Sequence, residues 1–150
     1  MSGETSLWLA GFEVNSLSEN QKEQWRVLLV GIAKGKGRVS VFLAKNRFIT
    51  LEFLKSLAER ENLKKGKLRV YRRTKIGRGF AKQYADTFAN CLECAVFEQP
   101  EQFWLGMAGN GETQNGWGYH FVGDSFEQCN AYKERLMLAI KKCGTLAFES

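Results

Sequence analysis

The sequence contains very little of several residue types whose abundance defines a protein class. Its 150 residues include one proline, one histidine and four cysteines. A single proline excludes a collagen-like or proline-rich low-complexity chain, and four cysteines are too few for a disulfide-based scaffold. The composition therefore predicts a reduced, intracellular protein that is either cytoplasmic or associated with nucleic acid.

Long apolar stretches are also absent. No apolar run reaches the ~18 residues that a membrane span requires, and residues 1–6 lack the basic stretch before an apolar core that opens a signal peptide. Hydrophobic residues nevertheless make up 44% of the chain and aromatic residues 13%, which is enough to bury a core. We therefore expect one compact domain over residues 1–150, with no membrane contact.

Groups that carry out catalysis are scarce as well. His120 is the single histidine, and no pattern of cysteines or acids accompanies it, so a triad or a His-based metal site has no visible partners. Asp86 and Asp124 are the only aspartates, and a two-metal nuclease needs several converging carboxylates. We therefore expect no catalytic residues and no cofactor. The alternative is a hydrolase or nuclease whose Glu and Lys residues are brought together by the fold.

Acidic residues are missing from one segment, and this absence fixes where the charge lies. Residues 64–82 contain nine Lys and Arg and no Asp or Glu, whereas residues 1–63 carry a net charge of +2 and residues 83–150 a net charge of −5. The formal net charge of +6 is therefore local. A local patch of one sign attracts polyanions and raises their rate of encounter.

The basic segment reads as a strand over residues 67–75, followed by the loop Gly77-Arg78-Gly79. Because side chains alternate between the two faces of a strand, we expect one cationic face with a tyrosine at its centre. Phosphates would contact the cations, and a base would stack on the tyrosine ring. The predicted nucleic-acid-binding residues are Lys64, Lys65, Lys67, Arg69, Tyr71, Arg73, Lys75, Arg78 and Lys82.

Two other interpretations of the basic segment stay open. Lys and Arg also protect exposed edge strands from aggregation, and a basic strand can dock an acidic protein partner, which would make the chain an adaptor or inhibitor. We favour nucleic acid as the partner, and RNA or single-stranded DNA over duplex DNA. The reason is that the candidate surface is a sheet and no predicted helix is basic enough to read a major groove.

Periodicity and turn residues predict an α+β fold: a mainly antiparallel sheet with two or three helices packed on it. Residues 7–14 read as a strand or a short apolar helix. Ser18 and Gln21 form a capping-box pattern at the start of a short helix. Besides this short helix over residues 19–25, the predicted helices cover residues 50–62, 80–97 and 126–142. Thr50 is the predicted cap of the first of these three, and the last is capped by Asp124 or Ser125 and stopped by Gly144.

Two hairpins followed by helices suggest an internal pseudo-repeat over residues 7–66 and 67–149. The first hairpin joins residues 25–33 and 38–44 around Lys34-Gly35-Lys36-Gly37, and the second joins residues 103–108 and 117–122. Residues 145–149 add an edge strand. The predicted unit is thus a hairpin and a helix, used twice.

The cysteines and the aromatic residues of the last third are expected in the core. Cys91-x-x-Cys94 has zinc-ligand spacing, but it falls in a predicted helix rather than in a turn, so we expect no metal site. Cys129 and Cys143 continue the apolar stripe of the last helix, where a free thiol packs as a small apolar side chain. Trp117, Tyr119 and Phe121 share one strand face, which favours packing over base stacking.

Overall fold

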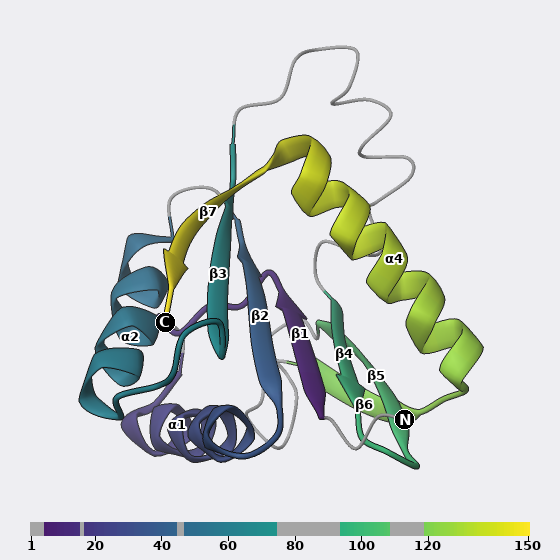
Figure 1. Cartoon of the computed structure of the whole chain (residues 1–150), viewed down its shortest axis with the longest axis horizontal. Helices are drawn as coiled ribbons and strands as arrows, with labels where there is room; N and C mark the ends of the chain where they lie inside the picture. Colours follow the sequence, from purple (N-terminus) through teal and green to yellow (C-terminus); the bar gives the residue numbers. More distant parts are fainter. Residues whose placement is uncertain (1–4, 16, 45–46, 75–93, 109–118) are drawn as a thin grey trace.

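The computed structural model describes residues 5–15, 17–44, 47–74, 94–108 and 119–150. In these residues, three helices pack on one seven-stranded mixed sheet, an α+β fold (Figure 1). The helices are α1 (Glu19–Lys34), α2 (Phe48–Arg60) and α4 (Phe126–Cys143). The strands are β1 (Ser6–Ala10), β2 (Arg38–Leu43), β3 (Leu68–Arg73), β4 (Cys94–Glu98), β5 (Phe103–Ala108), β6 (Tyr119–Gly123) and β7 (Gly144–Glu149).

The sheet has the strand order β6-β5-β4-β1-β2-β3-β7. Strands β1, β2 and β3 are parallel to one another, whereas β4, β5, β6 and β7 join the sheet through antiparallel pairs. The prediction of a mainly antiparallel sheet is therefore only partly correct. The parallel centre arises because helices, not tight turns, connect β1 to β2 and β2 to β3.

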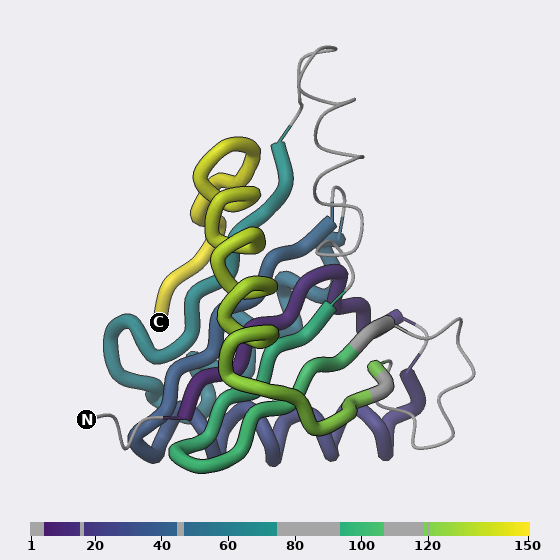
Figure 2. The backbone as a smooth tube through the Cα atoms, turned by 90° about the vertical axis from the view of Figure 1, so that its right-hand side faces the viewer, coloured from purple at the N-terminus to yellow at the C-terminus, as the bar shows by residue number. Residues whose placement is uncertain are grey.

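The helices lie on opposite faces of the sheet: α1 and α2 on one, and α4 on the other (Figures 1 and 2). Side chains of β1 alternate accordingly. Leu7 and Leu9 pack in the cluster that contains the buried residues of α1 and α2, while Ala10 packs in the cluster of α4. Among the described helices, none is both long and apolar enough to cross a membrane.

The predicted first hairpin is wrong, because residues 25–33 belong to helix α1. Ser18 caps this helix as expected, with the Gln21 amide donating to Ser18 Oγ and the Ser18 amide donating to Gln21 Oε1. The helix then continues to Lys34, since Trp25, Leu29 and Ile32 recur at helical spacing and are all buried. Burial of this stripe outweighs the β propensity of the individual residues. Residues 25–62 therefore hold a helix, a strand and a helix.

The prediction of a helix up to residue 97 is also wrong where the structure describes it. Residues 94–98 form strand β4, which pairs with β1 on one side and β5 on the other. Cys94, Ala95 and Val96 are fully buried. A strand buried on both faces has no period of two, so its pattern does not distinguish it from a helix. Residues 80–93 of the predicted helix lie outside the described residues.

Several local predictions are confirmed. The helix predicted at 50–62 corresponds to α2, but it begins at Phe48, so Thr50 lies inside the helix and Arg47 is at the N-cap position. Strands β5 and β6 pair as the predicted second hairpin. Ser125 caps α4, with its Oγ accepting from the Gln128 amide, and the helix ends at Gly144. The predicted edge strand is β7.

A buried threonine joins the loop after β1 to the first turn of α2. Thr50 is fully buried, its Oγ1 accepts from the Val14 amide at 3.1 Å and it donates to Glu13 Oε1 at 2.8 Å. The second carboxylate oxygen of Glu13 pairs with Arg47 Nε at 2.8 Å. One hydroxyl therefore satisfies a buried amide and orients a carboxylate at the same time.

We expect Thr50→Val to lower the free energy of unfolding by about 1–3 kcal/mol, because the buried Val14 amide loses its acceptor while the side-chain volume is kept. Urea unfolding measures this difference. Ser56→Ala, an exposed change in the same helix, serves as the control and should have little effect. Equal stability of the two variants would contradict the assigned role of the hydroxyl.

Two glycines near the end of α1 should respond to alanine in opposite directions. A Cβ on Gly37 would lie 2.8 Å from the Thr5 carbonyl oxygen and 2.5 Å from the Ile32 side chain, whereas a Cβ on Gly31 meets nothing within 4 Å. We expect Gly37→Ala to destabilise the protein by about 1–3 kcal/mol through overpacking. Gly31→Ala should stabilise the helix by up to about 1 kcal/mol. Thermal unfolding of both variants tests the pair, and a shared sign would contradict the expectation.

Candidate nucleic-acid interface

The structure describes the predicted basic segment from Lys64 to Thr74. Within it, β3 spans Leu68–Arg73, which confirms most of the strand predicted over residues 67–75. Lys75, Arg78 and Lys82 lie outside the described residues, together with the loop Gly77-Arg78-Gly79. The described part of the chain therefore includes six of the predicted site residues: Lys64, Lys65, Lys67, Arg69, Tyr71 and Arg73.

The predicted cationic face of β3 is the face on which α4 packs. Leu68 and Val70 are buried in the cluster beneath α1 and α2, so Arg69, Tyr71 and Arg73 alternate onto the other face. There Tyr71 is half-buried and packs against the cluster that includes Leu136 and Cys143 of α4. The tyrosine ring is therefore partly used in packing, and it does not stand freely between two cations.

Two of the predicted cations bind groups of the protein itself. Lys67 Nζ donates to the carbonyl oxygens of Gly35 at 3.0 Å and Gly37 at 3.1 Å. Arg69 Nε lies 2.6 Å from Glu149 Oε2, and this hydrogen bond raises the pKa of the arginine. Both side chains therefore help to hold β3 against its surroundings, which reduces their availability to a ligand.

Strand β3 is an inner strand, because β7 pairs along its outer side from Arg69 to Arg73. Its cations therefore do not protect a free edge, as the edge-strand interpretation would require. For the same reason, a protein partner has no free edge of β3 to which it could add a strand.

Four cations lie on the backbone segments where β3 ends and α4 passes into β7, with Arg72 and Arg73 on opposite faces of the sheet; we call them the basic corner. Arg72 pairs in register with Thr145 and Arg73 with Gly144, and both the amide and the hydroxyl of Thr74 donate to the Cys143 carbonyl oxygen at 2.7 and 2.9 Å. Lys141 and Lys142 occupy the turn of α4 immediately before this junction. The basic corner thus consists of Arg72, Arg73, Lys141 and Lys142.

Within the described ranges, no cation of the basic corner forms an ion pair. Arg72, Lys141 and Lys142 are exposed, and Arg73 is half-buried. The two lysines also have a structural role, because positive charge in the last turn of a helix stabilises its dipole. A dipole of partial charge does not neutralise four full charges, so the corner keeps a positive potential.

No pattern in the sequence places Lys141 and Lys142 in the site. They lie almost seventy residues after Arg72 and Arg73, and only the β3–β7 pairing brings the two pairs together. Arg72 contributes to the charge of residues 64–82, but its side chain alternates away from the predicted face. Lys64 and Lys65 lie at the other end of β3, in the turn closed by the hydrogen bond from the Lys67 amide to the Lys64 carbonyl oxygen. The six residues from Lys67 to Arg73 span about 20 Å at ~3.3 Å per residue.

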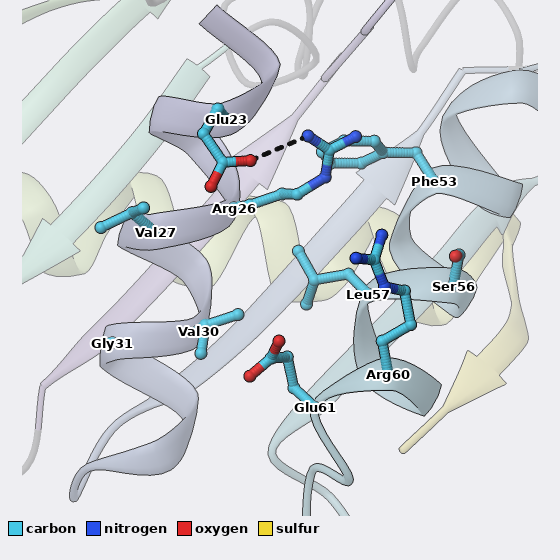
Figure 3. Close-up of a pocket in the computed structure, with 10 residues that line it drawn as sticks. All are labelled: Glu23, Arg26, Val27, Val30, Gly31, Phe53, Ser56, Leu57, Arg60 and Glu61. Carbon is cyan, nitrogen blue, oxygen red and sulfur yellow. Dashed lines mark hydrogen bonds and ion pairs between the residues drawn. The ribbon is translucent and has the colours of Figure 1, made fainter. Parts of the chain in front are cut away.

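A cleft of about 590 Å³ between α1 and α2 has a different character (Figure 3). Arg26 lies over the Phe53 ring at 4.9 Å and pairs with Glu23 at 3.1 Å. Lining residues also include Arg60 and Glu61, and Glu61 pairs with Lys34. Because arginines and glutamates are present in equal number, the charges that line this cleft balance, unlike those of the basic corner.

Tyr119 and the three described cysteines belong to the core, as predicted. Tyr119 is buried, and its hydroxyl donates to the Ala10 carbonyl oxygen at 2.7 Å. Cys129 and Cys143 are buried on α4, and Cys94 is buried on β4. Trp117 and Cys91 lie outside the described residues. In the part of the chain that the structure describes, no three His, Cys, Asp or Glu residues cluster in a way that could hold a metal ion.

In comparisons with known proteins, no family model, curated protein or solved structure matches this chain.

Burial raises the pKa of the Cys129 thiol, and the nearby carboxylates of Asp124 and Glu98 add to the effect. Because the pKa of this thiol is higher in the folded state, its protonation favours folding. This contribution to the free energy of unfolding is fully present below the unfolded thiol pKa of about 8.5 and decreases as pH rises above it. We expect Cys129→Ala to lose less stability than the parent chain between about pH 7.5 and 9.5. Urea unfolding across this range tests the difference, and parallel curves would contradict it.

Proposed function

We propose that this chain binds single-stranded nucleic acid, with RNA favoured, and that the basic corner contacts the phosphate backbone. The observation that carries the proposal is that the end of β3 with Arg72 and Arg73 lies beside the end of α4 with Lys141 and Lys142. These are four cations without ion-pair partners among the described residues. Phosphate contacts of this kind position a strand without reading its sequence. We further propose that the chain acts by binding and does not catalyse a reaction.

Two further observations support this choice of surface. The sequence continues from Thr74 with Lys75, Arg78 and Lys82 and contains no acidic residue before position 83. The cleft between α1 and α2, by contrast, balances its arginines with glutamates. A polyanion is therefore expected to prefer the basic corner to the cleft between α1 and α2.

Binding of a fluorescent oligo(U) of about twelve nucleotides, measured by anisotropy across a salt series, tests the proposal. Four phosphate contacts predict a log–log salt slope of about −3 for a single strand. The double variants Arg72→Gln/Arg73→Gln and Lys141→Gln/Lys142→Gln should each weaken binding about tenfold or more and make the slope shallower by ~1.4.

The matched control is Lys36→Gln/Arg60→Gln, which removes two exposed cations that also form no ion pair in the described residues. Lys36 precedes β2 and Arg60 ends α2, so both lie at the opposite end of the parallel strands from the basic corner. Circular dichroism establishes that all variants fold. Unchanged affinity in both corner variants, or no binding at low salt, would contradict the proposal.

The same assay with polyglutamate distinguishes the protein-partner alternative. Binding of polyglutamate in the absence of any binding to oligo(U) or oligo(dT) would favour an adaptor or inhibitor that docks an acidic protein, and it would overturn the proposed function.

A further inference from the structure

Strand β7 forms one edge of the sheet in the described part of the chain. It is the last strand in the order of the described sheet, with β3 as its only strand neighbour there. Its sequence Gly-Thr-Leu-Ala-Phe-Glu contains no lysine, arginine or proline, the residues with which proteins usually protect such an edge. The single charge, on Glu149, is held by Arg69. The edge is therefore chemically suited to pairing with another strand.

The exposure of the β7 side chains also favours pairing with another strand. Thr145, Leu146 and Ala147 are all exposed, and Leu146 retains 48% of its surface. Leu146 lies opposite Tyr71 in the register, so it shares the face of the sheet on which α4 lies. A second β7 running antiparallel would cover this leucine and satisfy the open backbone groups.

Building on the nucleic-acid binding proposed above, we propose that two copies of this chain pair through β7, antiparallel about a twofold axis, and that the pair is the form that binds the polyanion. A twofold contact uses the same surface on both copies and closes on itself, so it ends at a dimer. The bound polyanion then stabilises the dimer, because a ligand that prefers one state shifts the equilibrium toward it.

The geometry of β3 and β7 explains why the dimer would improve the site. Within one copy, Lys64 and Lys65 lie beside the carboxyl end of β7, where Ser150 Oγ donates to the Lys64 carbonyl oxygen at 2.7 Å. The basic corner lies at the other end of β7. Antiparallel pairing puts the Ser150 end of one copy beside the Gly144 end of its partner.

Lys64 and Lys65 of one copy would then face the basic corner of the second copy across about three strand spacings, roughly 14 Å. Within a single chain, the same groups lie at opposite ends of the stretch from Lys67 to Arg73, which spans about 20 Å. The dimer thereby joins the two separated groups of predicted site residues into one basic strip on each side of the twofold axis. Neither copy forms this strip alone.

The edge contact alone should be weak. The strand has six residues, and a bulge lies in its pairing with β3 between Val70 and Tyr71, which increases local twist. Each copy also carries a formal charge of +6, so the copies repel. We therefore expect dimerisation without ligand to strengthen when salt rises from about 0.15 to 1 M and screens this repulsion. Oligo(U) should strengthen it already at the lower salt.

Leu146→Lys is the decisive variant. It places like charges near the twofold axis and should weaken dimerisation at least about tenfold. Leu138→Lys is the control, because Leu138 is similarly exposed at 43% but lies on α4, away from the edge. Both changes add one cation. If a single copy were the binding form, Leu146→Lys would leave oligo(U) affinity unchanged or raise it, whereas we expect it to fall about tenfold with the dimer.

Sedimentation velocity of the full chain, with and without oligo(U) of about twelve nucleotides, measures the dimer directly. A dimer weakened by Leu146→Lys and not by Leu138→Lys, and strengthened by oligo(U), supports the inference. A chain that stays monomeric while it binds oligo(U) through the basic corner would overturn the inference and leave the proposed function standing. A dimer that binds no oligo(U) would overturn the proposed function, and the shared strip with it.

Discussion

The pairing of β7 with β3 is the interaction on which the candidate site depends. It covers the outer side of the basic strand, binds Arg69 to Glu149, and brings the end of α4 to the end of β3. Without this pairing, Arg72 and Arg73 would be isolated from Lys141 and Lys142. The same pairing also transfers the free edge of the sheet from a strand rich in arginine to one with no cation. The addition of β7 to the sheet thus determines both where the cations lie and which strand forms the edge.

The basic strand shows how a correct local prediction can give an incomplete site. Alternation along β3 was predicted from the sequence, and Leu68 and Val70 are indeed buried. Alternation does not reveal what packs against the face that carries Arg69, Tyr71 and Arg73. Tyr71 contacts the α4 cluster because the sheet carries helices on both sides, and Lys67 binds two carbonyl oxygens of the turn before β2. Charge pattern predicts where cations are, and tertiary contacts decide which of them are engaged.

The successes and failures of the fold prediction follow from the range of the interactions involved. Caps are local, and the Ser18 and Ser125 caps were both predictable from sequence. Trp25 and Val96 were assigned to the wrong element types because both occur in nearly continuous apolar runs, in which helix and strand give similar patterns. The parallel centre of the sheet depends on the order of strands far apart in the chain, which no local pattern encodes. Lys141 and Lys142 were missed for this same reason.

The central position of β1 has a consequence for the order of assembly. This strand pairs with β2 on one side and β4 on the other, so its second neighbour is synthesised more than eighty residues later. Contacts with such large sequence separation close slowly, and a nascent chain with β1, β2 and β3 in place would still expose the inner edge of β1. The amino-terminal half should therefore be prone to association while translation proceeds, until residues 94–98 arrive and cover that edge.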